Sequence, residues 1–201
     1  DANLRESKLE DVDLLGANLN GADLDRAHWG EDYVLRNHKV AKELAAQGDD
    51  RRAQAKYQEA EDTYQIIRQR YEAKGTTDIA GRFFYNGMVC KRMQMPMWSI
   101  GRFWSLMVDW ICGYGEDPIR VISFSLAVVV VSALLFCLTG MSHGDNIYAF
   151  HLTNGLGEDF NILCYAMYYS IVTFTTLGYG DMVALGWGKA IAAFEAFAGV
   201  F

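Results

Sequence analysis

The sequence predicts a mainly helical membrane protein in which a polar N-terminal part precedes a membrane-embedded C-terminal part. Residues 1–120 carry 17 basic and 20 acidic groups, whereas residues 121–201 carry one basic group and five acidic ones. Residues 121–139 contain no charge, and the first 27 residues follow a five-residue repeat. This division excludes a single water-soluble globule, and the chain has no Lys/Arg cluster that would favour nucleic acid as a partner.

Leucine recurs every five residues at the N-terminus, at Leu4, Leu9, Leu14, Leu19 and Leu24. A small or short residue stands two positions before each leucine, at Ala2, Ser7, Val12, Ala17 and Ala22. A period of five fits neither a helix nor a strand, but it fits a chain that turns one corner per unit. These units resemble the pentapeptide-repeat family, which implies a right-handed four-sided β-helix fragment over 1–29. The fragment is interpreted as a spacer or cap, with a partner-binding surface as the alternative. Its core must be completed by further coils or by the next segment.

Residues 30–96 are predicted to form a cytoplasmic helical module. The spacing of Tyr57, Ala60, Tyr64, Ile67 and Tyr71 indicates an amphipathic helix over 51–74. Further helices are expected over 33–47 and from 77 to 93. The module weakly resembles a tetratricopeptide-type hairpin. Packing or oligomerisation is favoured as its role over a groove for a cytoplasmic protein partner.

Residues 97–117 are rich in aromatic side chains, among them Trp98, Phe103, Trp104 and Trp110. Trp and Tyr favour the lipid–water interface, where an amphipathic ring has one wet end. The segment is therefore predicted to be an interfacial amphipathic helix, with an ordinary core helix as the alternative.

Residues 118–201 are predicted to hold the membrane-embedded elements. The first span is expected over 119–140, because its 19-residue uncharged core measures about 28 Å as a helix. The uncharged run 162–175 is too short to cross and is predicted to re-enter, and a second span is predicted to start over 188–201. Basic residues precede the first span and none occurs from 121 to 188, which places the N-terminus in the cytoplasm.

The chemistry is expected at Thr175-Thr176-Leu177-Gly178-Tyr179-Gly180-Asp181. Irregular backbone at membrane depth survives only where it is buried or lines a water-filled cavity. A cation that loses its water needs substitute oxygens, and backbone carbonyls can supply them if the strand alternates in handedness. Glycine adopts left-handed φ at little cost, which suits Gly178 and Gly180. The similar Gly113-Tyr114-Gly115 lacks a Thr pair and a preceding short helix, so it is interpreted as a turn.

This segment, with the preceding Tyr-Tyr-Ser-Ile-Val-Thr-Phe, resembles the two-transmembrane potassium-channel family over about 118–201. The resemblance implies two transmembrane helices with a re-entrant pore helix over 162–175 and a selectivity filter over 176–180. K⁺ would bind the carbonyls of Thr176, Leu177, Gly178 and Tyr179 and the Thr176 hydroxyl, with Gly180 completing the filter. Filter support is assigned to Thr175, Tyr168, Tyr169, Asp181 and Glu195.

Three positions depart from the usual family pattern. Leu177 replaces a valine, Tyr168 and Tyr169 replace two tryptophans, and Val172 replaces a glutamate that pairs with the aspartate equivalent to Asp181. Asp181 therefore needs another partner. Glu195 is expected to hydrogen-bond behind the filter, with attraction of cations to the cavity as the alternative. Gly199 is either the gating hinge of the second helix or a site of close packing.

The function predicted from these residues is passive, potassium-selective conduction through a homotetramer in the cell membrane, with N-terminal modules for assembly or regulation. A non-selective cation channel and a non-conducting membrane scaffold are the alternatives. The sequence shows no Ser/His/Asp constellation, phosphate loop or metal-ligand spacing, so neither an enzyme nor a bound cofactor is expected.

Overall fold

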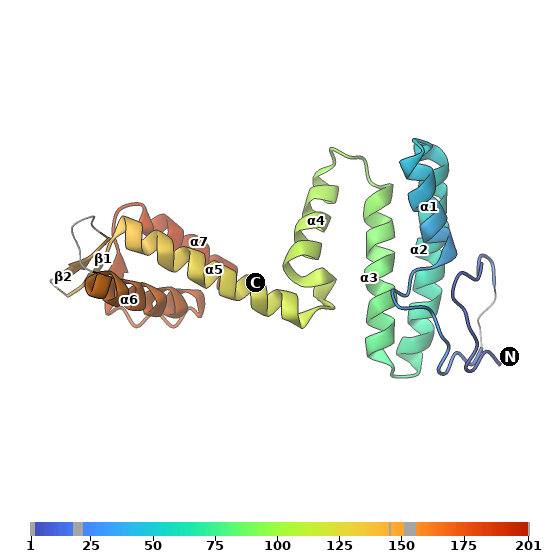
Figure 1. Cartoon of the computed structure of the whole chain (residues 1–201), viewed down its shortest axis with the longest axis horizontal. Coiled ribbons are helices and arrows are strands. Elements are labelled where there is room, and N and C mark those ends of the chain that lie inside the picture. The colour runs from blue at the N-terminus through green and yellow to red at the C-terminus, as the bar shows by residue number, and fades with distance from the viewer. Residues whose placement is uncertain (1–2, 18–21, 145, 151–155, 201) are drawn as a thin grey trace. The chain divides into compact units, whose positions relative to one another are not determined.

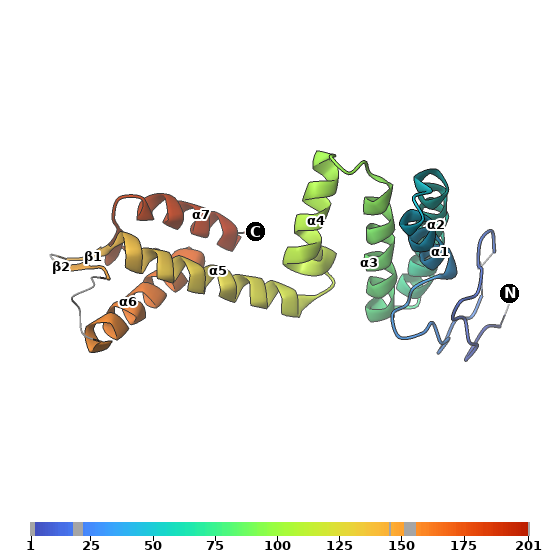
Figure 2. The ribbon, with the colours of Figure 1, turned by 45° about the horizontal axis from the view of Figure 1, so that its top comes forward.

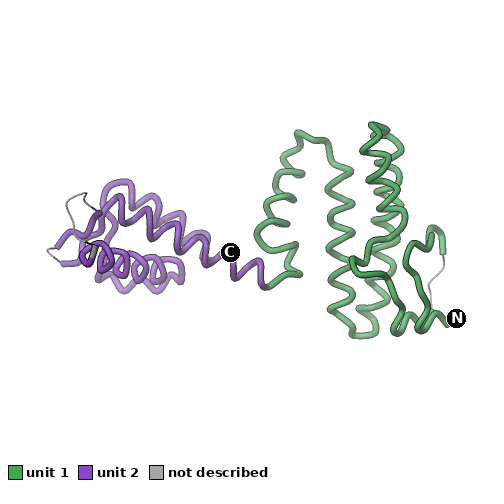
Figure 3. Tube along the Cα trace, viewed as in Figure 1, with its two compact units in different colours: residues 1–118 green, residues 119–201 purple. Residues whose placement is uncertain are grey.

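A computed structural model describes residues 3–17, 22–144, 146–150 and 156–200 of the chain. Ala2 and Leu19 of the repeat, and Phe201 at the end of the predicted second span, lie outside the described residues. The chain forms two compact units, residues 1–118 and 119–201, which are described separately (Figure 3). Both units are mainly helical.

The N-terminal residues form part of a coil. Asn3 pairs in parallel with Asp23, and Lys8 pairs with His28, so partners are separated by 20 residues, or four five-residue units. The Leu4 amide donates to the Asp23 carbonyl at 2.9 Å. This spacing is the one expected of a four-sided coil.

Three helices follow: α1 (Arg36–Ala46), α2 (Asp50–Ala73) and α3 (Thr77–Gln94). They lie side by side in both views (Figures 1 and 2). The Asp49 side chain caps α2 by accepting from an amide of its first turn. The first helix was predicted to begin at residue 33, but Tyr33 has φ of +53°, which the helix cannot accommodate.

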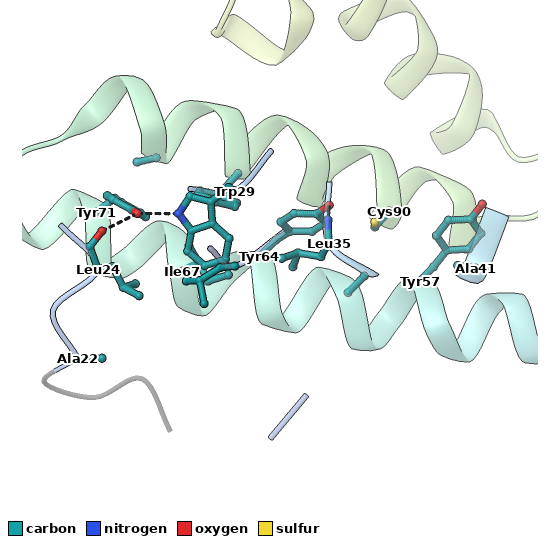
Figure 4. Packing of buried hydrophobic residues seen from close by; sticks show 14 of the residues in the cluster. Ala22, Leu24, Trp29, Leu35, Ala41, Tyr57, Tyr64, Ile67, Tyr71 and Cys90 are labelled. Carbon is teal, nitrogen blue, oxygen red and sulfur yellow. Dashed lines mark hydrogen bonds between the residues drawn. The ribbon is translucent and has the colours of Figure 1, made fainter. Parts of the chain in front are cut away.

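The coil packs its open end against α2 and α3. Trp29 Nε1 donates to Tyr71 Oη at 2.7 Å, and Tyr71 Oη donates to the Leu24 carbonyl at 3.0 Å (Figure 4). Phe83 of α3 meets the Trp29 ring edge-on, with centroids 5.0 Å apart. Repeat coils bury their apolar interior by stacking, and here the helices cover one end of the coil. Packing on the next segment was one of the two possibilities that the sequence predicted.

A buried histidine joins α1 to α2. His38 is 1% exposed, and its Nδ1 lies 3.1 Å from Tyr64 Oη. Its Nε2 has no hydrogen-bond partner among the described residues. Burial, together with the nearby positive charge of Lys42, lowers the pKa of His38 from its usual 6.5 to about 4. The folded unit therefore holds His38 in its neutral form.

This burial predicts acid lability of the helical module. The unfolded chain binds a proton at His38 below about pH 6.5, whereas the folded chain binds one only near pH 4. The free energy of unfolding therefore decreases as the pH is lowered from about 6.5 to 4. The loss amounts to about 3 kcal/mol by pH 4. Hydrogen exchange of α2 amides, corrected for intrinsic rates, measures it between pH 7.5 and 4.5. A His38→Met variant should show a shallower pH dependence, and equal slopes would contradict the prediction.

The last helix of the first unit is α4 (Ile100–Cys112), and it ends in a short 3₁₀ turn, η1 (Gly113–Gly115). Gly113 and Tyr114 have φ of +54° and +58°. The Gly-Tyr-Gly sequence at this point is thus a turn, as predicted. None of the residues of α4 is buried.

The second unit begins with α5 (Pro118–Thr139), which is long and apolar enough to cross a membrane, with a mean hydropathy of 2.8. It is the one such helix among the described residues. At 22 residues it is about 33 Å long. The final helix, α7 (Gly188–Val200), has 13 described residues and is about 20 Å long.

Between these helices lies α6 (Leu156–Phe174), which begins earlier than the predicted start at residue 162. The prediction took the uncharged run as the whole helix. Glu158 and Asp159 form its first turn, where acidic side chains interact favourably with the positive end of the helix dipole.

Three short strands, which the sequence analysis did not predict, form one antiparallel sheet. Strands β1 (Met141–His143), β2 (Asn146–Tyr148) and β3 (Met182–Ala184) are arranged in the order β2-β1-β3. Met141 lies opposite Ala184, so the chain leaving α5 is paired with the chain that follows residue 181. Met141, Met182 and Ala184 are buried together with α5 and α6 side chains.

Candidate functional site

The segment that follows α6 alternates in backbone handedness. Thr176, Gly178 and Gly180 have φ of +57°, +55° and +75°, while Leu177 and Tyr179 between them do not have positive φ. Positive φ was predicted for the two glycines. Thr176 also has positive φ, which was not predicted, and β-branched residues rarely adopt this conformation. Alternation of this kind turns successive carbonyls to the same side, where they can replace the hydration shell of a cation.

Amide groups of this segment turn back onto the end of α6. The Thr176 amide donates to the Thr173 carbonyl at 3.0 Å, and the Leu177 amide donates to the Val172 carbonyl at 3.0 Å. Val172 is buried, so this attachment point is held by packing. The amides satisfy carbonyls that would otherwise be left without a partner at the helix end. The start of this segment is therefore anchored to α6 through its amides.

Two tyrosines of α6 hold the chain just beyond this segment. Tyr168 Oη donates to Asp181 Oδ2 at 2.9 Å. Tyr169 Oη accepts from the Ala184 amide at 3.3 Å, and its ring packs against Phe136 of α5 with centroids 4.8 Å apart. The structure thus supplies the partner that the sequence required for Asp181, and it is a residue of the tyrosine pair.

A buried carboxyl lies behind the segment. Glu195 of α7 is fully buried, and Ser170 Oγ of α6 donates to its Oε1. Ser132 of α5 lies near the same carboxyl, whose Oε2 has no hydrogen-bond partner among the described residues. Ser170 Oγ also lies 2.8 Å from the Val129 carbonyl. These contacts join all three helices of the unit, and the support of the filter by Glu195 stays a prediction. Sequence reasoning missed Ser170 and Ser132, whose only signal was a hydroxyl within an otherwise apolar helix.

Gly199 packs against the last residue of α6. A Cβ placed on Gly199 would overlap the Phe174 carbonyl oxygen and would stand 2.8 Å from its carbonyl carbon. This contact supports the close-packing interpretation of Gly199, while the hinge stays a prediction. Glu195 and Gly199 are four residues apart on α7, as Ser170 and Phe174 are on α6. The two contacts are therefore successive turns of one helix–helix interface.

Apolar side chains of the segment and of α7 are exposed. Tyr179 is 67% exposed. Leu177 is also exposed, as are Phe194 and Phe197 of α7. Within a single chain, the side chains of Leu177, Tyr179 and Phe194 are thus largely exposed.

Comparison with known proteins assigns the class of this unit. Residues 124–201 match the ion channel family, and residues 1–28 match the family of pentapeptide repeats (8 copies). The chain therefore carries an ion-channel domain behind N-terminal pentapeptide repeats, and it is not an enzyme. An ion-channel domain implies a membrane location, in agreement with the single candidate span found among the described residues.

A curated relative is two-pore potassium channel 4 of Arabidopsis thaliana. It is 35% identical over 68 residues, which are 34% of this chain and 24% of the relative. The chain thus spans about a quarter of the relative's length. No solved structure matches the chain.

Proposed function

We propose that this chain forms a potassium-selective channel whose filter is Thr176 to Gly180. The alternating φ values at 176, 178 and 180 carry the proposal, because they suit a line of carbonyl ligands. K⁺ would bind the carbonyls of Thr176, Leu177, Gly178 and Tyr179, with the Thr176 hydroxyl at the inner end. The similarity to a plant potassium channel supports potassium as the permeant ion.

A ring of ligands requires more than one chain, because each chain contributes one strand. The proposed assembly is a homotetramer with cyclic symmetry. The exposed side chains of Leu177, Tyr179 and Phe194 support it, since neighbouring subunits would cover them. Mass measurement in mild detergent should give four chains, and a stable dimer would contradict the assembly.

The other helices and the N-terminal modules have roles that follow from their position in the chain. α5 is the first span and α7 the start of the second, with α6 as the re-entrant pore helix. Thr175, Tyr168, Tyr169, Asp181 and Glu195 support the filter. The N-terminal repeats and helices lie in the cytoplasm of a multi-pass protein of the cell membrane, where they assist assembly or regulation with a protein partner.

Flux through liposomes tests the proposal. Purified protein should pass K⁺ in preference to Na⁺, and Ba²⁺ should block the flux. Equal permeation of K⁺ and Na⁺ would favour a non-selective cation channel. Normal assembly without flux under any stimulus would favour a membrane scaffold.

Gly178→Ala should reduce K⁺ flux to background. An alanine at φ of +55° costs about 1–2 kcal/mol, and relaxation of this strain would turn a carbonyl out of line. Gly186→Ala is the matched control, because Gly186 also has positive φ and open space around it but lies beyond the filter. Flux in the Gly178→Ala variant equal to that of the control would contradict the assignment.

A further inference from the structure

The helix α4 carries its apolar side chains on the outside of its unit. Its exposed face, named here the aromatic face, includes the preceding Trp98 and comprises Trp98, Ile100, Phe103, Trp104 and Trp110. Trp98 is 99% exposed and Trp110 is 74% exposed. Soluble proteins rarely expose so large a contiguous apolar surface without a partner for it.

The polar side chains of α4 point the other way, into the unit. Arg102, Ser105 and Asp109 are spaced by three and four residues and therefore share one side of the helix. Asp109 Oδ2 accepts from Arg92 Nη1 of α3 at 2.6 Å, and both side chains are largely buried. Arg102 Nη1 donates to the Met95 carbonyl at 2.9 Å. A soluble amphipathic helix has the reverse arrangement.

The largely buried ion pair fixes the rotation of α4. Turning the aromatic face inward would turn Asp109 away from α3 and leave the Arg92 guanidinium there without its carboxylate, and removing one partner of a buried ion pair is strongly destabilising. Arg92 Nη1 also donates to Tyr114 Oη at 2.9 Å, and Ser105 Oγ lies 2.6 Å from the same hydroxyl. Tyr114 belongs to η1, so the network holds both α4 and the turn that leads to α5.

The surroundings of α4 in the chain indicate what covers the aromatic face. Six residue steps separate Cys112, the last residue of α4, from Pro118, the first of α5, a reach of about 20 Å at most. A bilayer that holds α5 is therefore within covalent reach of the end of α4. Three of the five tryptophans of the chain belong to this face, and tryptophan favours the lipid–water interface.

We propose that the aromatic face of α4 lies in the lipid–water interface, and that the Arg92–Asp109 pair thereby holds the helical module at the membrane surface. The ligand of this face is the headgroup and upper acyl region of the bilayer. The proposal rests on the membrane location in the proposed function, but not on potassium selectivity or on the tetramer.

Quenching by brominated phosphatidylcholine in liposomes tests it on the full chain. The fluorescence of the aromatic face is obtained by subtraction: the signal of a variant with Trp98, Trp104 and Trp110 all replaced by Phe is subtracted from that of the wild type. Lipid brominated near the headgroup should quench this difference at least twofold more than lipid brominated near the chain ends. In the triple variant, Ile66→Trp places a tryptophan on exposed α2, where no quenching is expected. Leu126→Trp places one on exposed α5, where deep quenching is expected.

Two results would overturn the proposal. Quenching of the α4 signal by aqueous iodide but not by brominated lipid would place the face in water. Protection from both quenchers would show that protein, such as a second copy of the chain, covers it. K⁺ flux measured on the same liposomes separates the two proposals. Intact flux without quenching by brominated lipid would contradict only the interfacial position of the aromatic face. Quenching by brominated lipid without flux would contradict only the channel function.

Discussion

Gly199→Ala is expected to abolish K⁺ flux and to lower the stability of the tetramer. The new methyl group would overlap the Phe174 carbonyl, which belongs to the rigid end of α6 and cannot move as a flexible side chain would. Overpacking of this kind costs about 1–3 kcal/mol. The strain would act directly beside Thr175 and Thr176, where the filter begins. Flux in liposomes and thermal dissociation of the tetramer measure the two effects.

The matched control is Gly157→Ala, in the first turn of the same α6. A Cβ at Gly157 meets no atom within 4 Å, so the variant should conduct like wild type. The hinge interpretation of Gly199 gives a different result: conduction falls while thermal stability is unchanged or rises. Wild-type flux in Gly199→Ala would contradict both interpretations.

Glu195→Leu is expected to reduce K⁺ flux at least tenfold, whereas Glu195→Gln should keep most of it. Leucine removes the Glu195 acceptor of Ser170, whose hydroxyl then keeps only the Val129 carbonyl, and a hydrogen bond to a charged group contributes about 1.5–3 kcal/mol. Glutamine retains an acceptor oxygen of similar shape in the same place. Single-channel recording and liposome flux distinguish a displaced filter from a lowered conductance.

A double variant makes this prediction specific to the contact. Ser170→Ala should reduce flux less when Glu195 is already Leu, because the two substitutions remove the same hydrogen bond. Glu158→Gln, at an exposed position in α6, is the control and should have no effect. The alternative, in which Glu195 attracts cations to the cavity, predicts instead that Gln and Leu lower conductance equally at low K⁺. That outcome would contradict the support role.

Local pattern was enough to predict most helices and the central part of the site. The amphipathic spacing from Tyr57 to Tyr71 located α2, and the uncharged run located α5. Gly178 and Gly180 were recognised because their residue type matches the backbone conformation that the chemistry needs. The start of α6 was placed too late, because charged Glu158 and Asp159 were read as loop although they suit a helix N-terminus.

The contacts that were missed join residues from separate elements. Sequence reasoning showed that Asp181 needed a new partner but could not select Tyr168, because the pairing depends on how α6 meets the chain beyond the filter. The sheet of β1, β2 and β3 was missed because its strands are three residues long and carry no clear alternation.

By itself the sequence determined the repeat period of the coil, the candidate membrane span, and the alternation of small and large residues over 176–180. These properties depend on neighbouring residues along the chain, and the backbone responds to them locally. The tertiary structure alone decided that α2 and α3 pack against the coil, that Ser170 meets Glu195, and that Gly199 touches Phe174. Those contacts depend on the packing of distant segments, which the spacing of residues in one segment does not specify.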